Sequence, residues 1–310
     1  MNDKKEIRNI LILVLIIAAV STLIIVRFYG NNQNERYNIS VIAGESHAER
    51  WIVLQQGVEK AGNDYNAQIN FYTVANGGDA KEQKELINRE LEKKVDAIII
   101  CAVDSREIQE VLQGNERRTP VILIETDLKP GHLYSQVSPD NYEMGYHLGE
   151  EFVRQQEGEE TTAAILIDND KIAAQQERVE GFEKALASAK NITIKWRASD
   201  YQSSEQVDNI ISMDCVGTQS AIEISRAHNE KIRVYGFGNA ETNIYYMDKG
   251  MIKVLVVPND FNMGYLSVQN AVQAVEKDTA YKRTIVEHIV VTGDTLHKEE
   301  NQRIIFPIVQ

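Results

Sequence analysis

Few side chains in this sequence are spaced for catalysis or for metal binding. The six histidines include no pair at i and i+4, the spacing that sets two metal ligands on one face of a helix. The Asp-Asn-Asp run at 168–170 could bind a cation but is more simply a solvated loop. Ser46 and His47 are adjacent, which alone does not make a nucleophile and its base. Neither Cys101 nor Cys215 has neighbours of the kind that activate a thiol. We therefore expect no catalytic residues, no metal and no cofactor.

Binding chemistry is better represented, by polar side chains near the ends of apolar segments. Arg178 carries a planar, permanently charged fork of donors that suits sugar hydroxyls or a carboxylate. Because Lys171 and residues 175–177 are polar, Arg178 could instead be exposed at the start of a helix. Glu125 follows the apolar run at 120–124, where its carboxylate could accept two hydroxyl hydrogens or simply meet solvent. We interpret both residues as ligand-binding.

Two aromatic residues and a second carboxylate are further candidates, each with a structural alternative. Trp51 offers a flat indole for the apolar face of a ring, but it also fits a helical apolar stripe with Leu54 and Val58. Phe237 could stack opposite Trp51 or pack in the core. Asp214 ends the strand predicted at 209–213, where it could bind ligand, cap the following helix, or do both.

These candidates depend on a regular alternation of strands and helices. Apolar runs typical of buried strands alternate with segments whose apolar residues recur every three or four positions, which is typical of helices. In the first half we predict strands at 37–43, 69–74, 96–103 and 120–124, and helices at 49–64, 79–93 and 105–112. In the second half we predict strands at 162–167, 192–197, 209–213, 231–237 and 252–257, and helices at 141–155, 178–189, 217–228, 245–249 and 263–277. Two such halves imply two parallel sheets covered on both faces, with ligand sites outside the carboxyl ends of the strands.

The first 36 residues have a different character. Residues 10–26 contain no charged side chain, and at about 1.5 Å per residue such a helix nearly spans a hydrocarbon core of about 30 Å. Lysine and arginine residues precede it, which places the N-terminus in the cytoplasm and the rest of the chain outside. We predict a cytoplasmic N-terminus at 1–9, an uncleaved transmembrane anchor at 10–29 and a polar tether at 30–36. The alternative, a cleaved signal peptide, would need a small-x-small site after the apolar run, and residues 24–29 offer none.

Composition excludes several classes of protein. The net charge is −13, from 33 basic and 46 acidic residues, whereas a nucleic-acid-binding surface needs an excess of Lys and Arg. Apolar residues make up 43% of the chain, too many for a disordered tail. Two cysteines cannot build a disulfide-rich scaffold or a four-cysteine zinc site.

Four motifs, in order along the chain, carry a resemblance to a known family. They are Asp140-Asn141-Tyr142-Glu143-Met144-Gly145, Arg178-Val179-Glu180-Gly181-Phe182, Val234-Tyr235-Gly236-Phe237-Gly238, and Gly250 with Pro258-Asn259 and Met263-Gly264-Tyr265. Their order and spacing resemble the type I periplasmic binding proteins, in the ribose-binding-protein-like branch of sugar-type solute-binding proteins, over residues 37–310. Lac-repressor-type regulators share this core but begin with a helix-turn-helix, where this chain has an apolar segment.

The resemblance implies an α/β fold of two Rossmann-like lobes joined by a three-crossover hinge and preceded by a transmembrane helix. Lobe one would be 37–138 plus 259–292, and lobe two 139–258 plus 293–310. Ligand would be trapped by closure of the hinge. The resemblance implies these ligand-binding residues: Trp51, Glu125, Arg178, Asp214, Phe237, Asn239 and Asn259.

Departures from the family pattern bear on the ligand. Gly238 stands where the family has an aspartate, with Asn239 beside it, and Pro258 stands at the late hinge glutamine, with Asn259 beside it. Cys101 and Met213 replace family asparagines. The polar set is therefore thinner than that of a ribose or galactose binder, and we expect a less hydroxylated or partly apolar ligand.

The connection between two strands of the second lobe is unusually short. Only residues 200–207 join strands that we predict to be parallel neighbours, whereas a parallel crossover usually needs a dozen or more residues. We therefore predict that a helix of this lobe is missing or reduced.

Two functions fit these features. The first is an extracellular, membrane-anchored solute-binding protein that captures a small carbohydrate-like ligand for an ABC-type permease, without enzymatic activity and without nucleic acid. The alternative is a ligand-sensing receptor that signals to a membrane histidine kinase, which an anchor would hold beside its partner at high effective concentration.

Overall fold

The structure is a computed structural model in which residues 20–21, 36–44, 48–75, 78–115, 119–128, 134–167, 169–198, 206–277 and 281–307 are described. The chain forms two compact units, Met1–Tyr37 and Asn38–Gln310, and the fold reported below is that of the second. The predicted N-terminus, anchor and tether lie outside the described residues except for positions 20, 21 and 36. Within the described ranges, no helix has the length and apolarity needed to cross a membrane.

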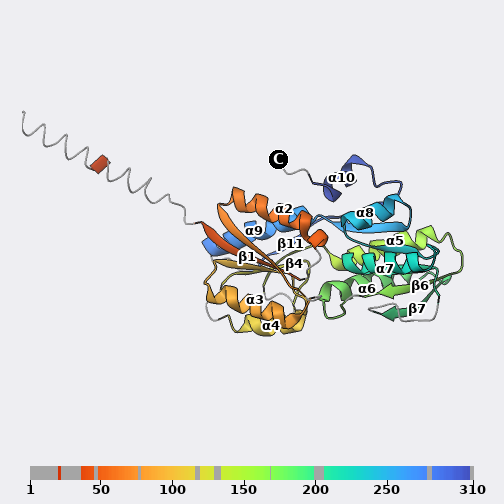
Figure 1. The fold of residues 1–310 in the computed structure, drawn as a ribbon, viewed down its shortest axis with the longest axis horizontal. Coiled ribbons are helices and arrows are strands. Elements are labelled where there is room, and N and C mark those ends of the chain that lie inside the picture. The colour runs from red at the N-terminus through yellow and green to blue at the C-terminus, as the bar shows by residue number, and fades with distance from the viewer. Residues whose placement is uncertain are drawn as a thin grey trace, which may run out of the picture. The chain divides into compact units, whose positions relative to one another are not determined.

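The first lobe is built on a six-stranded sheet of order β11-β5-β4-β3-β1-β2 (Figure 1). Its strands are β1 Tyr37–Ala43, β2 Ala67–Thr73, β3 Ala97–Ile100, β4 Val121–Ile124, β5 Ser135–Ser138 and β11 Arg283–Ile285. Its helices are α2 Ala48–Asp64, α3 Ala80–Glu92, α4 Ser105–Gln113 and α9 Asp260–Lys277. Helices α2 and α9 pack together on one face of the sheet, and α3 and α4 cover the other (Figure 1). The central strands β1, β3 and β4 are almost wholly buried, as parallel strands covered on both faces must be.

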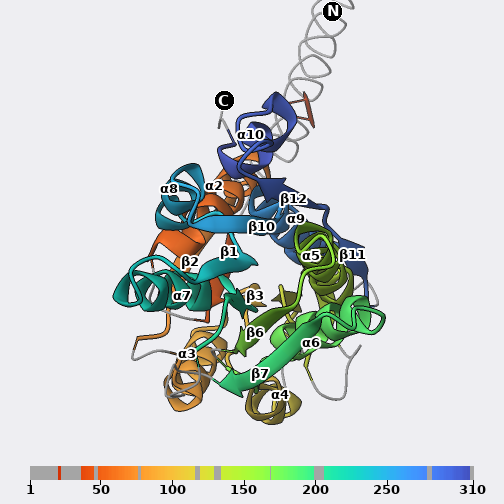
Figure 2. The same cartoon turned by 90° about the vertical axis from the view of Figure 1, so that its right-hand side faces the viewer.

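The second lobe repeats this architecture with a sheet of order β12-β10-β9-β8-β6-β7 (Figure 2). Its strands are β6 Thr161–Leu166, β7 Ile192–Ala198, β8 Asn209–Ser212, β9 Arg233–Phe237, β10 Ile252–Pro258 and β12 His288–Thr292. Its helices are α5 Asn141–Gln155, α6 Ala173–Leu186, α7 Cys215–Ala227, α8 Glu241–Asp248 and α10 Glu299–Ile305. All pairs in the sheet are parallel except β10 with β12.

In the second lobe, successive side chains of a strand point to opposite faces of the sheet and join two separate core clusters. Tyr235 and Phe237 of β9 face α5 and α6, where they pack with Phe152 and Phe182, while Val234 faces α7 and α8. Phe152 and Tyr235 meet edge to face, with ring centroids 4.9 Å apart. Full burial of each such side chain contributes about 1.5–3 kcal/mol.

The chain passes between the lobes three times, as the resemblance predicted. The crossings follow β5, β10 and β11, so α9 and β11 belong to the first lobe although they come late in the sequence. The sheets place β12 in the second lobe, whereas the expected boundary put residues up to 292 in the first. Strands β5, β11 and β12 and helix α10 were not predicted, because they are short and have weak apolar patterns.

The predicted pairing around residues 200–207 is wrong. Strands β7 and β8 are not neighbours, because β6 lies between them and pairs with both. The reason is the strand order: β7 is the edge of the sheet, and the chain must pass β6 to continue inward at β8. The middle of this connection, at 199–205, lies outside the described residues.

Candidate functional site between the lobes

A carboxylate at the carboxyl end of β4 binds two arginines. Glu125 Oε2 lies 2.7 Å from Arg50 Nη2, and Glu125 Oε1 lies 3.0 Å from Arg178 Nη2. The side chains are 13%, 7% and 3% exposed, respectively. Burial acts to raise the pKa of Glu125, but the two guanidinium groups outweigh it and hold the pKa at about 2. The pair Glu125–Arg178 joins the two lobes.

The backbone at Glu125 is held in an uncommon conformation. Its φ of 63° lies in the left-handed region, which costs a residue with a Cβ about 1–2 kcal/mol. The first crossover supports it, because Asn141 Nδ2 donates to the Glu125 carbonyl at 2.7 Å. Non-glycine residues in this region cluster at functional sites, where the surrounding structure holds them in place.

Arg178 is buried in α6, and each of its donor nitrogens has an acceptor. Nε donates to Asn141 Oδ1 and Nη1 donates to the Met213 carbonyl, both at 3.0 Å, in addition to the ion pair with Glu125. The guanidinium carbon lies 4.9 Å from the centre of the Phe237 ring, a cation–π contact. The sequence alternative of an exposed Arg178 is therefore wrong, because the helix begins at Ala173 and turns this residue inward.

Two buried charged residues of the site were missed by the sequence analysis. Arg50 lies over the ring of Trp51, 4.7 Å from its centre, and its Nη1 is 3.5 Å from Asp260 Oδ2. Asp260, in the first turn of α9, is fully buried, which raises its pKa to about 6 although Arg50 acts to lower it. The helical periodicity could have indicated that both residues are buried. Arg50 lies four residues before Leu54 on the apolar stripe of α2, and Asp260 lies three residues before Met263 on the apolar stripe of α9.

A small cavity lies where these groups meet. Its volume is about 50 Å³, and its lining includes Trp51, Glu125, Arg178 and Asp214 from the predicted set, with Arg50, Cys101 and Gln175 beside them. Cys101 Sγ lies 3.5 Å from Glu125 Oε2. Small-molecule sites usually measure about 300–1,000 Å³. A sugar ring therefore requires the lobes to move apart from the positions seen here.

Three of the predicted residues, Phe237, Asn239 and Asn259, are not among the residues that line this cavity. Phe237 contacts Arg178 as described, and Asn239 Nδ2 is 3.5 Å from the Ile305 carbonyl. Asn259 Nδ2 donates to Glu287 Oε1 at 2.9 Å, which links the second and third crossovers. Asp214 accepts from the Gly217 amide at 2.7 Å, so it caps α7 while also facing the cavity.

Metal binding finds no support in the side-chain arrangement. Among the described residues, no group of three or more His, Cys, Asp and Glu side chains is placed to hold a metal ion. Of the run at 168–170, Asp168 lies outside the described residues. Asn169 instead donates to the Val103 carbonyl in the first lobe, at 2.8 Å.

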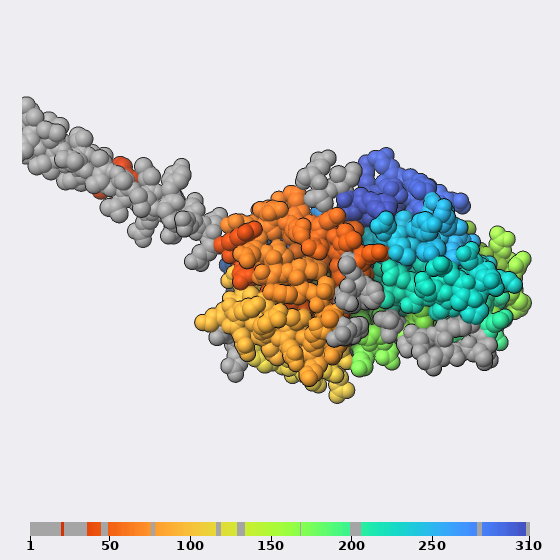
Figure 3. All heavy atoms as spheres, in the orientation of Figure 1, coloured from red at the N-terminus to blue at the C-terminus, as the bar shows by residue number. Residues whose placement is uncertain are grey.

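Direct hydrogen bonds hold the lobes together beside the cavity. The N-terminus of α6 has no capping side chain of its own, and its first amides are capped from the first lobe. Ala173 N donates to Ser105 Oγ and Ala174 N to Thr126 Oγ1, both at 3.1 Å. The orange atoms of α2 meet the blue and cyan atoms of the second lobe (Figure 3), and Thr242 of α8 donates to Glu49 of α2 at 3.0 Å.

The two lobes, the three crossings and a polar cavity between the sheets agree with the comparison to known families. Residues 39–279 match the family model of the periplasmic binding protein domain. The chain belongs to this family. Periplasmic binding proteins bind solutes without enzymatic activity, so this chain is a binding protein and not an enzyme.

Individual relatives of this periplasmic binding protein are distant. It is 28% identical over 190 residues to the HTH-type transcriptional repressor PurR of Vibrio cholerae, covering 55% of each chain, so it spans about half the length of the curated relatives it matches. A carbohydrate transporter solute binding protein from Agrobacterium radiobacter, in complex with D-arabinose, is similar with a TM-score of 0.80 at 15% identity, over 88% of this chain and 100% of that one. A chain of the XylFII-LytSN complex is similar with a TM-score of 0.74 at 19% identity, over 84% and 98%. At these identities the solved structures show the fold.

Proposed function

We propose that this protein captures a small carbohydrate-like ligand between its lobes and delivers it to an ABC-type transporter. The observation that carries the proposal is the polar cavity shared by both lobes, with Glu125 and Asp214 as acceptors, Arg178 as donor and Trp51 as an aromatic wall. The similarity of the fold to an arabinose-bound solute-binding protein supports a sugar-like ligand.

Ligand entry would exchange partners within the buried charged cluster. Arg178 and Glu125 satisfy each other across the lobe boundary, so a ligand hydroxyl that approaches either residue competes with an existing ion pair. Trp51 supplies apolar area from the first lobe, whereas Phe237 contributes through its contact with the guanidinium group of Arg178. The replacement of family asparagines by Cys101 and Met213 reduces the hydroxyl partners, which favours a less hydroxylated sugar.

The proposal includes the membrane anchor at 10–29, with the binding unit on the outer side. The anchor would keep the receptor beside its membrane partner. For this reason the alternative function is a sensor that signals to a membrane histidine kinase. The similarity to a chain of the XylFII-LytSN complex supports a protein partner. Identification of the proteins that co-purify from native membranes after cross-linking would separate a permease from a kinase.

The test of ligand binding is a thermal-shift screen of the full chain with sugars, polyols and nucleosides, followed by calorimetry on any compound that stabilises it. We expect Arg178→Lys, which keeps the charge but loses the planar fork, to weaken binding at least tenfold. Arg154→Lys on the exposed side of α5 is the control and should bind as the wild type does. Equal affinity of the Arg178 variant and the wild type would remove this residue from the ligand set.

A further inference from the structure

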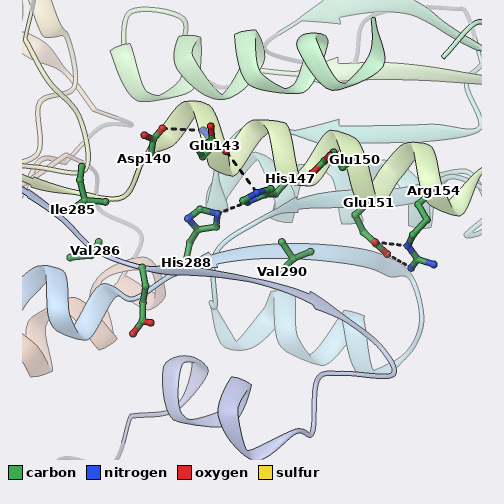
Figure 4. A pocket seen from close by; sticks show the side chains of 11 residues that line it. Asp140, Glu143, His147, Glu150, Glu151, Arg154, Ile285, Val286, His288 and Val290 are labelled. Atoms are coloured by element: carbon green, nitrogen blue, oxygen red, sulfur yellow. Dashed lines mark hydrogen bonds and ion pairs between the residues drawn. The ribbon is translucent and has the colours of Figure 1, made fainter. Parts of the chain in front are cut away.

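A second and larger hollow lies on the hinge side of the molecule, away from the cavity between the lobes. Its volume is about 840 Å³, and it runs between one face of α5 and the extended segment that forms β11 and β12. Figure 4 shows Glu143, His147, Glu150, Glu151 and Arg154 in a row along α5, with His288 and Val290 of β12 facing them. Ile285, Val286 and Val290 give it an apolar floor, and Ile285 is 51% exposed.

The segment below this groove forms the edge of both sheets. Strand β11 is the last strand of the first sheet and β12 the last strand of the second, and only two residues separate them. The Lys282 carbonyl and the Val286 amide form hydrogen bonds with β5. Backbone groups alternate in direction along a strand, so those of Arg283 and Ile285 point away from β5, to the outer side. Among the described residues, no further strand pairs with this outer edge.

The β12 edge lacks the protection that exposed edges usually carry. Edge strands are commonly guarded by charged residues or proline against pairing with another chain. The opposite edge of the same sheet, β7, contains Lys195 and Arg197. Strand β12 reads His-Ile-Val-Val-Thr, and burial together with the neighbouring His147 lowers the pKa of His288, which disfavours a charge at this position. Strand β11 carries the exposed Arg283, so the unguarded, apolar part of the edge that favours addition of a strand is β12.

The charge around the groove indicates which kind of partner segment it would bind. Five carboxylates line it: Asp140, Glu143, Glu150, Glu151 and Glu287. Among the described lining residues the one arginine is Arg154, which is paired with Glu151 at 2.7 Å. His147 Nδ1 and His288 Nε2 share a hydrogen bond of 2.9 Å, so these two nitrogens hold one proton between them. The groove is therefore strongly negative and complements a basic segment.

We propose that this groove binds an extended, basic segment of a partner protein, which adds as a strand to the edge formed by β11 and β12. The main chain of the segment would pair with the open edge, its apolar side chains would meet the floor at Ile285 and Val290, and its Lys or Arg side chains would meet Glu143 and Glu150. Because the edge belongs to both sheets, a segment of about ten residues would contact both lobes at once. Its affinity would then depend on the angle between the lobes. The proposal goes beyond capture of a ligand and holds whatever the cavity between the lobes binds.

The probe is a synthetic decapeptide of alternating lysine and valine, with binding to the full chain in detergent micelles measured by fluorescence anisotropy. The protein variant is Glu143→Lys with Glu150→Lys, two exposed positions seven residues apart on α5. The matched control is Glu85→Lys with Glu92→Lys, two exposed positions with the same spacing on α3, which changes net charge equally at a distant site. A second peptide, methylated at alternate backbone nitrogens, keeps the charge but cannot donate to a strand edge.

We expect the α5 double variant to bind the peptide at least tenfold more weakly than the wild type, and the α3 double variant to bind it unchanged. The methylated peptide should also lose at least tenfold, and hydrogen exchange at Ile285 should slow when the unmodified peptide binds. If both double variants weakened peptide binding equally, the effect would come from the net charge of the protein and not from this groove, which would overturn the proposal. Equal binding of both peptides would exclude strand addition, and a protein dimer that dissociates on adding peptide would assign the edge to a second copy.

Discussion

The hydroxyl of Thr126, just after β4 in the first lobe, caps the amide of Ala174 in the first turn of α6 in the second lobe, at 3.1 Å. Ser105 caps Ala173 in the same way. The first amides of α6 donate hydrogen bonds to the other lobe. When the lobes separate, these amides must bond to water instead. Closure is therefore coupled to the stability of this helix end, which carries Arg178 about one turn further along.

Thr126→Val with Ser105→Ala should loosen the boundary between the lobes. Each lost cap costs about 1 kcal/mol, and the shape of the side chains is nearly kept. Hydrogen exchange at the amides of Ala173 and Ala174 measures the effect and should become several-fold faster. Thr73→Val, at an exposed position of β2, is the control. Unchanged exchange in the double variant would show that the caps do not hold the lobes together.

Glu125→Gln should strongly destabilise the binding unit. The substitution leaves Arg50 and Arg178 buried without their shared anion, and removal of one partner of a buried ion pair costs about 3–5 kcal/mol. Urea unfolding followed by circular dichroism gives the free energy. Glu85→Gln, on the exposed side of α3, should change it by less than about 0.5 kcal/mol. Similar values for the two variants would mean that the charges are solvated in solution.

Stability should fall as pH rises through about 6, because of Asp260. Its pKa is raised to about 6 in the folded protein, above the value of about 4 in an unfolded chain, so the folded state binds this proton more tightly. The contribution is complete below about pH 4 and is lost as pH rises through 6. Glu125 acts in the opposite sense, with stability present above about pH 4.5 and lost toward pH 2.

The two effects can be separated by pH. Between about pH 5 and 7.5, Asp260 should lower the free energy of unfolding by about 1 kcal/mol, while Glu125 stays ionised. Asp260→Asn, which does not titrate, should remove this difference. Urea unfolding at the two pH values measures it. The same pH difference in the variant and the wild type would place the titrating group elsewhere.

Gly145→Ala should destabilise the second lobe and disturb Arg178. A Cβ at residue 145 on α5 would overlap the backbone carbonyl of Arg178 on α6, so the two helices would have to separate. Overpacking of this kind typically costs about 1–3 kcal/mol. Gly293→Ala is the control, because nothing lies within 4 Å of a Cβ there. The midpoint of thermal unfolding measures both variants, and equal midpoints would contradict the close helix contact.

The parts of the fold that could be predicted are those in which one physical signal dominates. Residues Tyr37–Ala43 and Asn141–Gln155 follow from an apolar run and a clear helical period, and the predicted bounds match the structure. Strands β11 and β12 are edge strands with only partial burial, so their sequences lack the continuous apolar run of a central strand. Strand order cannot be read from periodicity at all, which is why β7 and β8 were paired incorrectly.

Four of the seven residues that we expect to bind ligand line one cavity, and their role in binding stays a prediction. Trp51, Glu125, Arg178 and Asp214 line one cavity, as expected of residues near strand ends on facing sheets. Their mutual pairing depends on the distance between the lobes, which no local pattern encodes. Arg50 and Asp260 were not predicted, because a charged residue beside an apolar helical stripe is usually taken to mark the end of that stripe. The structure shows that the apolar stripes of α2 and α9 meet near Glu125, which buries both charges.

The late position of α9 constrains how the protein is made. This helix covers one face of the first sheet together with α2, yet β5 is synthesised more than a hundred residues before it. At roughly 5–20 residues per second, the interval between them is on the order of ten seconds. During translation the first lobe must therefore wait with an uncovered apolar surface, while β6 to β10 are synthesised. The growing chain should depend on chaperones that hold such surfaces, and messages truncated before codon 260 should yield products that aggregate.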